Sequence, residues 1–386
     1  MAQKGEIELI HVTKRFGEVV AIDDISLKIP AGTYCCLLGP SGCGKTTILR
    51  MIAGHETPTQ GDVRIDAESV VGLPPVRRGT AMMFQSYALF PHLTCVDNVA
   101  FNLKMRGVLK DERREKAREM LARVHMEQFA DRMPAELSGG QQQRIALARS
   151  LITDPHVLLL DEPLSALDEF LRLQMRGNLR RMQKDLGITF IHVTHTQMEA
   201  IAVADMVVVM DNGHIDQAGH AHEIYSAPHS TYVARFMGGQ NVLSGKVLAV
   251  TGDVATLVEK NGARFSVPVK EKPPAVGDTI FFAVRRDRVE FEKAADATVR
   301  PDETNVIQGT VIMTEYQGSW VKVTVQREGA EDFVANVPDE RFFAAHVVEG
   351  DRILARWNTG GVHTLIYHGT EDVSRLYGQD FRAKPD

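Results

Sequence analysis

Short apolar runs alternate with amphipathic stretches along the chain as far as about residue 235. The apolar runs suit strands that are buried on both faces of a parallel sheet. The expected strands are 33–38, 80–84, 157–160, 189–193 and 206–210. Strands that alternate with helical segments predict an α/β fold, in which helices cover a sheet.

Helical segments are indicated where apolar residues recur at spacings of three and four. One lies between the second and third strands, where residues 110–119 mix both charge signs and are expected to form a solvated face. Another carries apolar residues at Leu171, Met175, Leu179, Met182 and Leu186. Gly187 should end that helix, whose apolar face is interpreted as core. Residues 211–213, Asp-Asn-Gly, predict a tight hairpin after the last strand.

The pattern of apolar and polar residues changes near Gly238. Beyond it the helical patterns nearly vanish, and short β-like runs are separated by Gly, Asp, Asn and Pro. Two segments recur there: 241–247 is similar to 305–311, and 276–280 is similar to 349–353. A repeat of units too small to fold alone predicts two related barrel-like modules that pack together.

These changes predict two domains in a globular chain of 386 residues. The first is 1–237, with a helical subdomain at about 88–155. The second is 238–386, which is β-rich and has two related halves.

Charge and cysteine content narrow the classes of function. The chain has 44 Lys and Arg against 50 Asp and Glu, a net charge of −6, and neither half is a basic block. This balance argues against a sequence-independent grip on nucleic acid. The four cysteines show no CxxC pairing, so neither a disulfide framework nor a zinc site is indicated. We expect four reduced thiols in a cytosolic protein.

No apolar run reaches the length of about 20 residues that a membrane span requires. The most apolar stretch, 201–210, is short and contains Asp205. Residues 1–6 lack the apolar core of a signal peptide. We expect the protein to stay in the cytosol and to act at a membrane only by docking on a partner that spans it.

The first candidate site is a glycine-rich loop. Residues 39–46 fit GxxxxGK[ST] and lie between an expected strand and a helical run, 47–53. Backbone N–H groups of the loop and the helix N-terminus can bind phosphate oxygens. Lys45 can reach the β- and γ-phosphates of ATP, and the Thr46 hydroxyl can ligate Mg²⁺. The candidate nucleotide-binding residues are Gly39, Pro40, Ser41, Gly42, Cys43, Gly44, Lys45, Thr46 and Thr47.

Two adjacent acids follow the strand 157–160, at the end of a sheet where ligands bind. Asp161 is expected to hold Mg²⁺, directly or through water. Glu162 is expected to orient the attacking water or accept its proton. The alternative for Glu162 is a helix-capping carboxylate before Pro163, but two neighbouring acids are costly without a cation.

A second anion-binding loop is indicated at Ser138, Gly139, Gly140 and Gln141. A hydroxyl and two glycines again open onto a helical run, this time without a lysine. One ATP needs only one such loop. We therefore expect a head-to-tail homodimer in which each γ-phosphate lies between the phosphate loop of one copy and the Ser138 segment of the other.

With these motifs, residues 6–237 resemble the ATP-binding-cassette (ABC) family. The resemblance implies a P-loop NTPase core with a helical subdomain, and ATP and Mg²⁺ as cofactors. It implies that Phe16 stacks on adenine, and that Gln85 senses Mg²⁺ and the γ-phosphate at the surface facing a transporter. It also implies that 165–168, with Asp168, crosses a dimer interface, and that His195 is a switch histidine contacting the γ-phosphate. The family often has Asp where Thr196 stands, so a local acidic contact is missing here.

The second domain resembles the small-barrel (OB/TOBE-like) tail of bacterial importer ATPases, at 282–286 and 315–320. Residues 77–85 are most similar to the spermidine/putrescine branch, with ferric-iron, sulfate and sugar importers as alternatives. The resemblance implies a peripheral ATPase subunit at the cytoplasmic face of the inner membrane. Its partners would be integral membrane permeases and, indirectly, a solute-binding protein. The alternative class is a non-transport ABC ATPase.

The remaining candidate residues are a segment near Gln85, four histidines and Cys43. The segment 87–93, near Gln85, could dock on a membrane partner, or its residues 90–93 could be core between subdomains. His214, His220 and His222 are expected in a solvent-exposed loop. His192 and the side chain of Cys43 are expected to be packing residues or to have no specific role.

Overall fold

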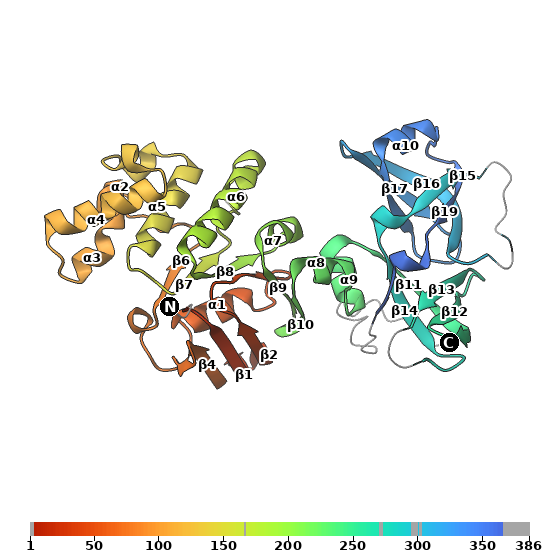
Figure 1. The fold of residues 1–386 in the computed structure, drawn as a ribbon, viewed down its shortest axis with the longest axis horizontal. Coiled ribbons are helices and arrows are strands. Elements are labelled where there is room, and N and C mark those ends of the chain that lie inside the picture. The colour runs from red at the N-terminus through yellow and green to blue at the C-terminus, as the bar shows by residue number, and fades with distance from the viewer. Residues whose placement is uncertain (1–3, 166, 270–272, 295–299, 301–302, 366–386) are drawn as a thin grey trace. The chain divides into compact units, whose positions relative to one another are not determined.

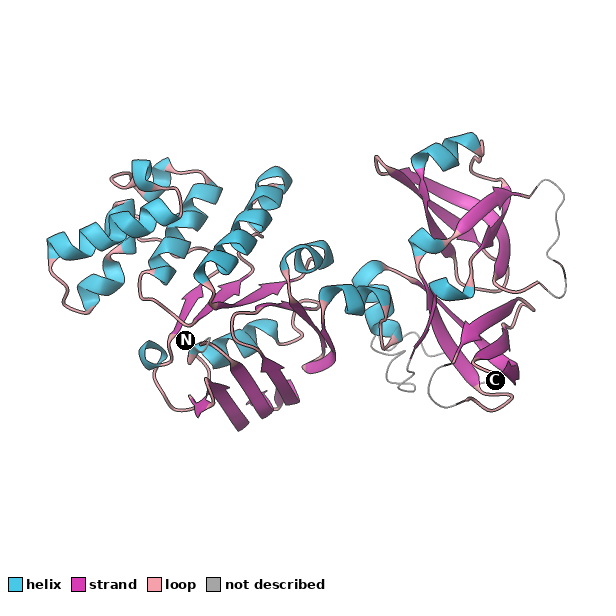
Figure 2. Ribbon diagram, viewed as in Figure 1, coloured by secondary structure: helices cyan, strands magenta, loops and turns pink. Residues whose placement is uncertain are grey.

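The computed structural model describes residues 4–165, 167–269, 273–294, 300 and 303–365 of the chain. Its contacts divide the chain into two compact units, Met1–Ala221 and His222–Asp386. The first unit mixes helices and strands, whereas the second consists mainly of strands (Figures 1 and 2). Among the described helices, none combines the length and apolarity that crossing a bilayer requires.

A six-stranded sheet forms the centre of the first unit, in the order β10-β9-β3-β8-β7-β6. β10 is antiparallel to β9, and all other neighbours are parallel. The bounds are β3 Tyr34–Leu38, β6 Thr80–Met83, β7 Val157–Asp161, β8 Thr189–Thr194, β9 Met206–Asp211 and β10 His214–Gly219. The five strands predicted from the apolar runs are confirmed.

Helix α1 (Lys45–Ala53) packs between this sheet and a second, antiparallel sheet of order β2-β1-β4-β5. The strands of the second sheet are β1 Ile7–Phe16, β2 Val19–Ile29, β4 Gln60–Ile65 and β5 Glu68–Ser69. Ile48 and Met51 of α1 share a buried core with Leu9 and Val63 of the second sheet. The helix that begins at the phosphate loop is thus held from both sides.

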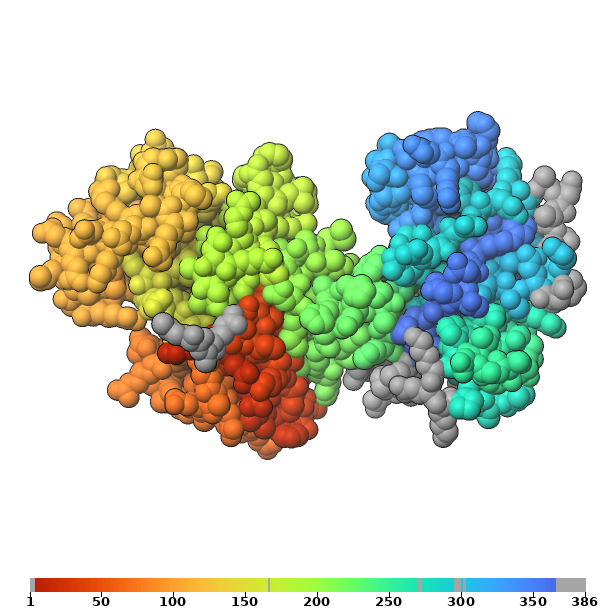
Figure 3. All heavy atoms as spheres, viewed as in Figure 1, coloured from red at the N-terminus to blue at the C-terminus, as the bar shows by residue number. Residues whose placement is uncertain are grey.

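Four helices with a core of their own gather on one side of the first unit (orange to yellow in Figure 3). They are α2 Cys95–Val99, α3 Phe101–Met105, α4 Lys110–Arg123 and α5 Gly139–Leu151. Val99, Leu121 and Ile145 are buried together there. Most of the charged residues of 110–119 are exposed, as the charge pattern predicted.

The ends of two elements follow local sequence signals. Helix α6 (Glu169–Leu186) begins after Asp168, whose Oδ1 accepts a hydrogen bond from the Leu171 N–H at 3.0 Å. It ends at Gly187, which has a φ of 64°. The hairpin between β9 and β10 turns through Asn212 and Gly213, with φ of 44° and 82°. A shorter helix, α7 (Gln197–Val203), follows β8.

The second unit contains two five-stranded antiparallel sheets, of order β13-β12-β11-β14-β20 and β15-β19-β16-β17-β18. Its strands are β11 Asn241–Thr251, β12 Val254–Val258, β13 Arg264–Pro268, β14 Thr279–Val284, β15 Glu290–Lys293, β16 Val306–Tyr316, β17 Trp320–Gln326, β18 Phe333–Pro338, β19 Arg352–Arg356 and β20 Val362–Leu365. Its helices are α8 Ala221–Ser226, α9 Thr231–Gly238 and α10 Asp339–Ala344. Two strands join the sheet formed mainly by the other part of the unit. β15 pairs with β19, in the sheet of β16–β19, and β20 pairs with β14, in the sheet of β11–β14.

Residues of the predicted repeat make equivalent contacts in the two sheets. Asn241 exchanges two hydrogen bonds of 2.8 Å with the backbone of Val334. Asn305 exchanges two, of 2.8 and 3.2 Å, with the backbone of Ser266. Each asparagine therefore ties its own sheet to the other one. A shared apolar core, in which Trp357 stacks between two phenylalanines, fills the space between the sheets.

The first compact unit ends at Ala221, earlier than the predicted domain boundary at 237/238. The reason is that α9 packs on β11 and β14, where Ala234 is buried against Ala283. The extent of each domain by sequence, 1–237 and 238–386, stays a prediction.

Candidate nucleotide-binding and hydrolysis site

The phosphate loop connects β3 to α1, as predicted. Two glycines in it cannot carry a side chain. A Cβ on Gly39 would lie 2.3 Å from the Met210 carbonyl oxygen, and one on Gly44 would lie 2.3 Å from Cδ1 of Ile22. Gly44 also has a φ of 102°, a conformation that residues with a Cβ rarely adopt. The loop is therefore shaped by close packing against its neighbours.

The ammonium group of Lys45 lies inside the loop. Its Nζ donates hydrogen bonds to the carbonyl oxygens of Gly39 at 2.8 Å and Pro40 at 2.7 Å. Lys45 is 6% exposed, and Sγ of the buried Cys43 lies 3.6 Å from Nζ. Ser41 and Gly42 are exposed on the outer side of the loop. A positive charge is thus held where the loop can receive an anion.

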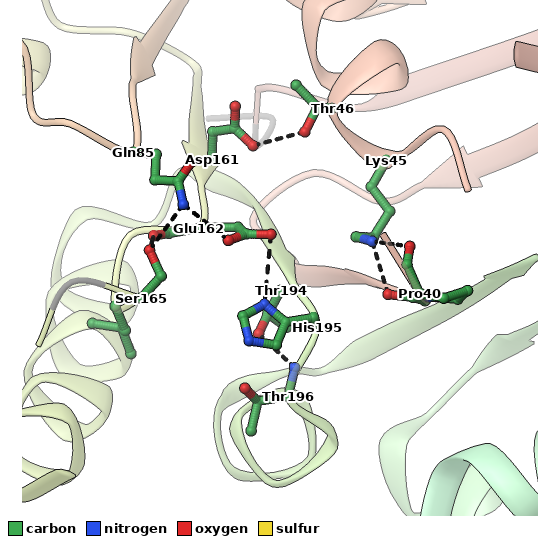
Figure 4. A network of polar contacts seen from close by, with 12 residues as sticks. Pro40, Lys45, Thr46, Gln85, Asp161, Glu162, Ser165, Thr194, His195 and Thr196 are labelled. Carbon is green, nitrogen blue, oxygen red and sulfur yellow. Dashed lines mark hydrogen bonds and ion pairs between the residues drawn. The ribbon is translucent and has the colours of Figure 1, made fainter. Parts of the chain in front are cut away.

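Thr46 and Asp161 connect the loop to the end of β7. The Thr46 hydroxyl donates to Oδ1 of Asp161 at 3.0 Å, while Thr47 is the next residue of α1 (Figure 4). Burial raises the pKa of Asp161 despite that hydrogen bond, and the charge of Glu162 raises it further. A cation at this position would offset the cost of the buried charge.

Glu162 follows β7 in a left-handed conformation, with a φ of 46°. Its Oε2 accepts a hydrogen bond from Nε2 of Gln85 at 3.2 Å, and its Oε1 lies 3.5 Å from Nδ1 of His195 (Figure 4). Gln85 also donates to the Ser165 hydroxyl at 3.4 Å. Positive φ is uncommon outside glycine and is frequent at functional sites. The structure thus brings together three residues predicted separately from the sequence: Gln85, Glu162 and His195.

A magnesium ion at this site would be bound by a hydroxyl, an amide and a carboxylate oxygen rather than by a cluster of acids. Among the described residues, no three His, Cys, Asp or Glu side chains form a metal-binding cluster. Thr46, Gln85 and Asp161 supply a hydroxyl, an amide and a carboxylate near the loop. Mg²⁺ usually combines one or two such ligands with water and substrate phosphates. The donor set therefore fits Mg²⁺ bound together with a nucleotide.

Phe16 lies at the end of β1 and is 47% exposed. Nζ of Lys14 lies 4.6 Å from the centroid of its ring. An aromatic ring that is about half exposed is suited to stacking on a planar base.

The Ser138 segment begins α5, with Ser138 N–H bonded to Oε1 of Gln141 at 2.9 Å. Gly139 and Gly140 lie beside Leu167 and Leu171, next to Asp168. Residue 166, in the predicted interface loop 165–168, lies outside the described residues. Within the described ranges, no hydrogen bond or ion pair joins Ser138–Gln141 to the phosphate loop. One copy of the chain thus leaves the two predicted anion-binding loops separate.

Sequence reasoning missed a buried polar chain behind His195. Tyr34, His192, Thr194 and Glu199 are bonded to one another and buried. The sequence predicts no polar contact for His192 and assigns no role to Glu199. The available signal was a carboxylate just before the apolar run 200–203.

The fold and this site define the ATP-hydrolysing cassette of an ABC transporter. Family models match the chain in two places: the ABC transporter model at residues 22–165 and the TOBE domain model at 282–365. The chain is 43% identical over 364 residues to the spermidine/putrescine import ATP-binding protein PotA of Rubrobacter xylanophilus, covering 94% of each chain. The chain belongs to the ABC transporter family, among import ATP-binding proteins that carry a TOBE domain.

Two further relatives support this assignment. The Fe(3+) ions import ATP-binding protein FbpC 1 of Rhizobium meliloti is 44% identical over 341 residues, covering 88% of this chain and 93% of the relative. The ATP-binding cassette MJ0796, solved as a dimer in a post-hydrolysis state bound to ADP and Pi, is 33% identical with a TM-score of 0.50. That match covers 56% of this chain and 98% of MJ0796. The chain binds nucleotide and hydrolyses ATP.

Proposed function

We propose that two copies of this chain hydrolyse ATP at a shared interface and thereby energise solute uptake through membrane-spanning permeases. The observation that carries the proposal is the position of Glu162. Its carboxylate lies between Gln85 and His195, one residue after Asp161, which contacts the phosphate loop. A carboxylate there can take a proton from water that attacks the γ-phosphate.

Nucleotide binding is assigned to the phosphate loop, to Phe16 at the end of β1 and to the residues that would hold Mg²⁺. Lys45 would exchange its carbonyl contacts for β- and γ-phosphate oxygens, and the backbone N–H groups of residues 41–47 would bind the rest. Phe16 would stack on the adenine. Thr46, Asp161 and Gln85 would hold Mg²⁺, which neutralises charge that develops on the phosphates.

The hydrolysis step is assigned to three side chains. Glu162 orients the attacking water and accepts its proton. His195, whose side chain is 57% exposed, donates a hydrogen bond to the γ-phosphate. Gln85 contacts Glu162 and reports the state of the γ-phosphate to the surface beyond it.

The second half of the site is assigned to a second copy of the chain. Ser138, Gly139, Gly140 and Gln141 would bind the γ-phosphate of the partner's ATP, with Asp168 at the interface. Support comes from the dimeric MJ0796 cassette and from the separation of the two loops within one chain. The γ-phosphate then closes the dimer, and hydrolysis removes the bridge.

The Ser138→Arg variant tests the composite site. An arginine there should block closure of the dimer while ATP still binds to the monomer. Size-exclusion chromatography with ATP in a Glu162→Gln background measures closure, and a nucleotide-binding assay measures affinity. A Ser138→Arg protein that dimerises normally with ATP would remove the Ser138 segment from the site.

A groove near Gln85 is the proposed contact with the permease. Its cavity of about 600 Å³ is lined by Val76, Phe84, Phe90, Phe101 and Met105, among others. Val76 and Met105 are 83% and 69% exposed. Phe90 packs on Phe101, with ring centroids 4.3 Å apart. Arg149 of α5 crosses from the helical region to this groove, where it donates to the Tyr87 and Ala88 carbonyls at 2.7 Å. A protein so docked would be peripheral at the cytoplasmic face of the inner membrane.

The solute is proposed to be a polyamine, with ferric iron as the second candidate. The spermidine/putrescine relative aligns with 94% of this chain, and the Fe(3+) relative aligns with 88%. Sulfate and sugar importers follow. The permeases and a solute-binding protein, rather than this chain, would contact the solute.

Uptake measurements test the proposed function. Cells lacking the gene should lose uptake of labelled spermidine, and the wild-type gene should restore it, whereas the Glu162→Gln gene should not. Loss of Fe³⁺ uptake alone would select the second candidate. Unchanged uptake of every solute, with permeases absent from the purified complex, would favour a non-transport ABC ATPase.

A further inference from the structure

A chain of buried polar groups lies behind His195. Tyr34, His192 and Glu199 are 0%, 0% and 4% exposed, and they come from β3, β8 and α7. The Tyr34 hydroxyl is 2.9 Å from Nδ1 of His192, and Nε2 of His192 is 2.8 Å from Oε1 of Glu199. Buried polar groups are costly unless they are paired, and pairing of this kind fixes one geometry.

The chain of contacts ends on the backbone of the turn that carries His195. Oε2 of Glu199 accepts a hydrogen bond from the Thr194 hydroxyl at 3.0 Å. That hydroxyl in turn accepts one from the Thr196 N–H at 3.0 Å (Figure 4). Thr194 and Thr196 flank His195 directly. The turn is therefore fixed from inside the protein on both sides of the histidine.

Glu199 acts as a carboxylate in this series of buried polar groups. Burial by itself raises the pKa of Glu199, but hydrogen bonds from His192 and Thr194 and the charge of Arg176 outweigh it and hold that pKa below its ordinary value. The Thr194 hydroxyl donates to Oε2 of Glu199, and Nε2 of His192 lies 2.8 Å from Oε1. The carboxylate thus holds the strand β8 and the turn after it in one arrangement.

His195 depends on this support. Its Nδ1 lies 3.5 Å from Glu162, which is long for a hydrogen bond, and the ring is largely exposed. The backbone must therefore aim the ring. We infer that Glu199, held by His192 and Tyr34, is a positioning residue that sets the direction of His195 through Thr194. The inference rests on the proposed contact between His195 and the γ-phosphate.

The same contacts connect the two sides of the site. Tyr34 begins β3, and the phosphate loop begins directly after that strand. The Tyr34 ring also packs on Phe190 of β8, with ring centroids 5.4 Å apart. The loop that binds the phosphates and the turn that carries His195 are thus kept in register. Errors of about 1 Å in such positions can cost about 100-fold in rate.

Two threonines on one strand provide the test. Thr194 and Thr189 lie on β8, are 2% and 0% exposed, and each hydroxyl bridges a backbone N–H to an acceptor. For Thr189 those partners are the Gly32 N–H and the Gly5 carbonyl. Thr194→Val and Thr189→Val should therefore lower the thermal midpoint similarly. Only Thr194→Val should also lower kcat, by about tenfold or more, with KM for ATP within about twofold of wild type.

A double-mutant cycle separates positioning from general structural damage. If Thr194 and Glu199 act through His195, Thr194→Val and Glu199→Ala should cause no further loss of single-turnover rate in a His195→Ala background. Glu199→Gln, which keeps an acceptor for Thr194, should retain more activity than Glu199→Ala. Equal fractional losses with and without His195 overturn the inference, as does wild-type kcat in Thr194→Val.

The single His195→Ala variant keeps the two hypotheses apart. If that variant turns over ATP normally, the proposed role of His195 is wrong, and the inference is wrong with it. If His195→Ala is inactive while Thr194→Val and Glu199→Ala keep wild-type kcat, only the inference is wrong.

Discussion

The candidate site of the first unit and the buried asparagines of the second unit place polar groups differently. In the first unit, Asp161, Glu162 and His195 lie at the carboxyl ends of parallel strands and are at least partly exposed, and Glu162 approaches His195 only to 3.5 Å. In the second unit, Asn241 and Asn305 are buried, and each is paired with backbone through two hydrogen bonds. Polar groups that are kept available can bind a substrate, whereas groups that are fully paired stabilise a fold.

The largest effect is expected at Glu162, one of the available polar groups of the first unit. Glu162→Gln should lower kcat by about 100-fold or more, because the amide cannot accept a proton from water. ATP affinity and thermal midpoint should stay near wild type, since the amide keeps the size of the side chain. Steady-state hydrolysis and nucleotide binding measure the two effects. Normal turnover in this variant would remove Glu162 from the reaction.

The second prediction concerns the paired groups of the second unit. Asn241→Ala leaves the N–H and carbonyl of Val334 without their partner, which should cost about 1–3 kcal/mol of unfolding free energy. Asn305→Ala should act similarly at Ser266. Denaturant unfolding and hydrolysis per folded molecule measure the outcome. A large loss of kcat without a loss of stability would contradict the assignment of these two asparagines to stabilising the fold.

The third prediction tests Phe16, an exposed side chain. Phe16→Ala should weaken ATP binding by about fivefold, or ~1 kcal/mol, if the ring stacks on adenine. Val19→Ala is the matched control, because Val19 pairs with Phe16 across the hairpin and is 67% exposed. Equal affinity in both variants, measured by nucleotide titration, would mean that Phe16 does not contact the base.

The smallest effect on stability is expected at Asp161, where function opposes stability. Because its pKa is raised in the folded protein, its ionisation destabilises the nucleotide-free state. Asp161→Asn should therefore unfold at a slightly higher temperature than wild type at neutral pH. The difference should vanish at acidic pH, below the pKa of the unfolded chain. Magnesium-dependent hydrolysis should fall, and a variant less stable at neutral pH would contradict the assignment.

The sequence predicted the parts of the site that depend on local pattern. The loop at 39–46, the acids after β7 and the start of α5 at the Ser138 segment each carry a signature within a few residues. The central strands were also predicted, because their apolar runs are continuous. The antiparallel sheet of β1, β2, β4 and β5 was not singled out, since its residues alternate between buried and partly exposed positions.

Contacts between distant segments could not be predicted. Tyr34 and His192 are 158 positions apart, and no spacing rule brings them together. The exchange of β15 and β20 was also beyond the repeat pattern, which shows that two halves are related but not which strand completes which sheet.

That exchange affects the order in which the protein can fold during synthesis. The first sheet of the second unit lacks its β20 partner until residue 365 has left the ribosome, although its other strands have emerged by Val284. The first unit needs only the chain up to Ala221. N-terminal domains commonly fold first during translation. The nucleotide-binding unit can therefore be complete while the nascent tail still exposes an open strand edge, the point at which chaperone protection is needed most.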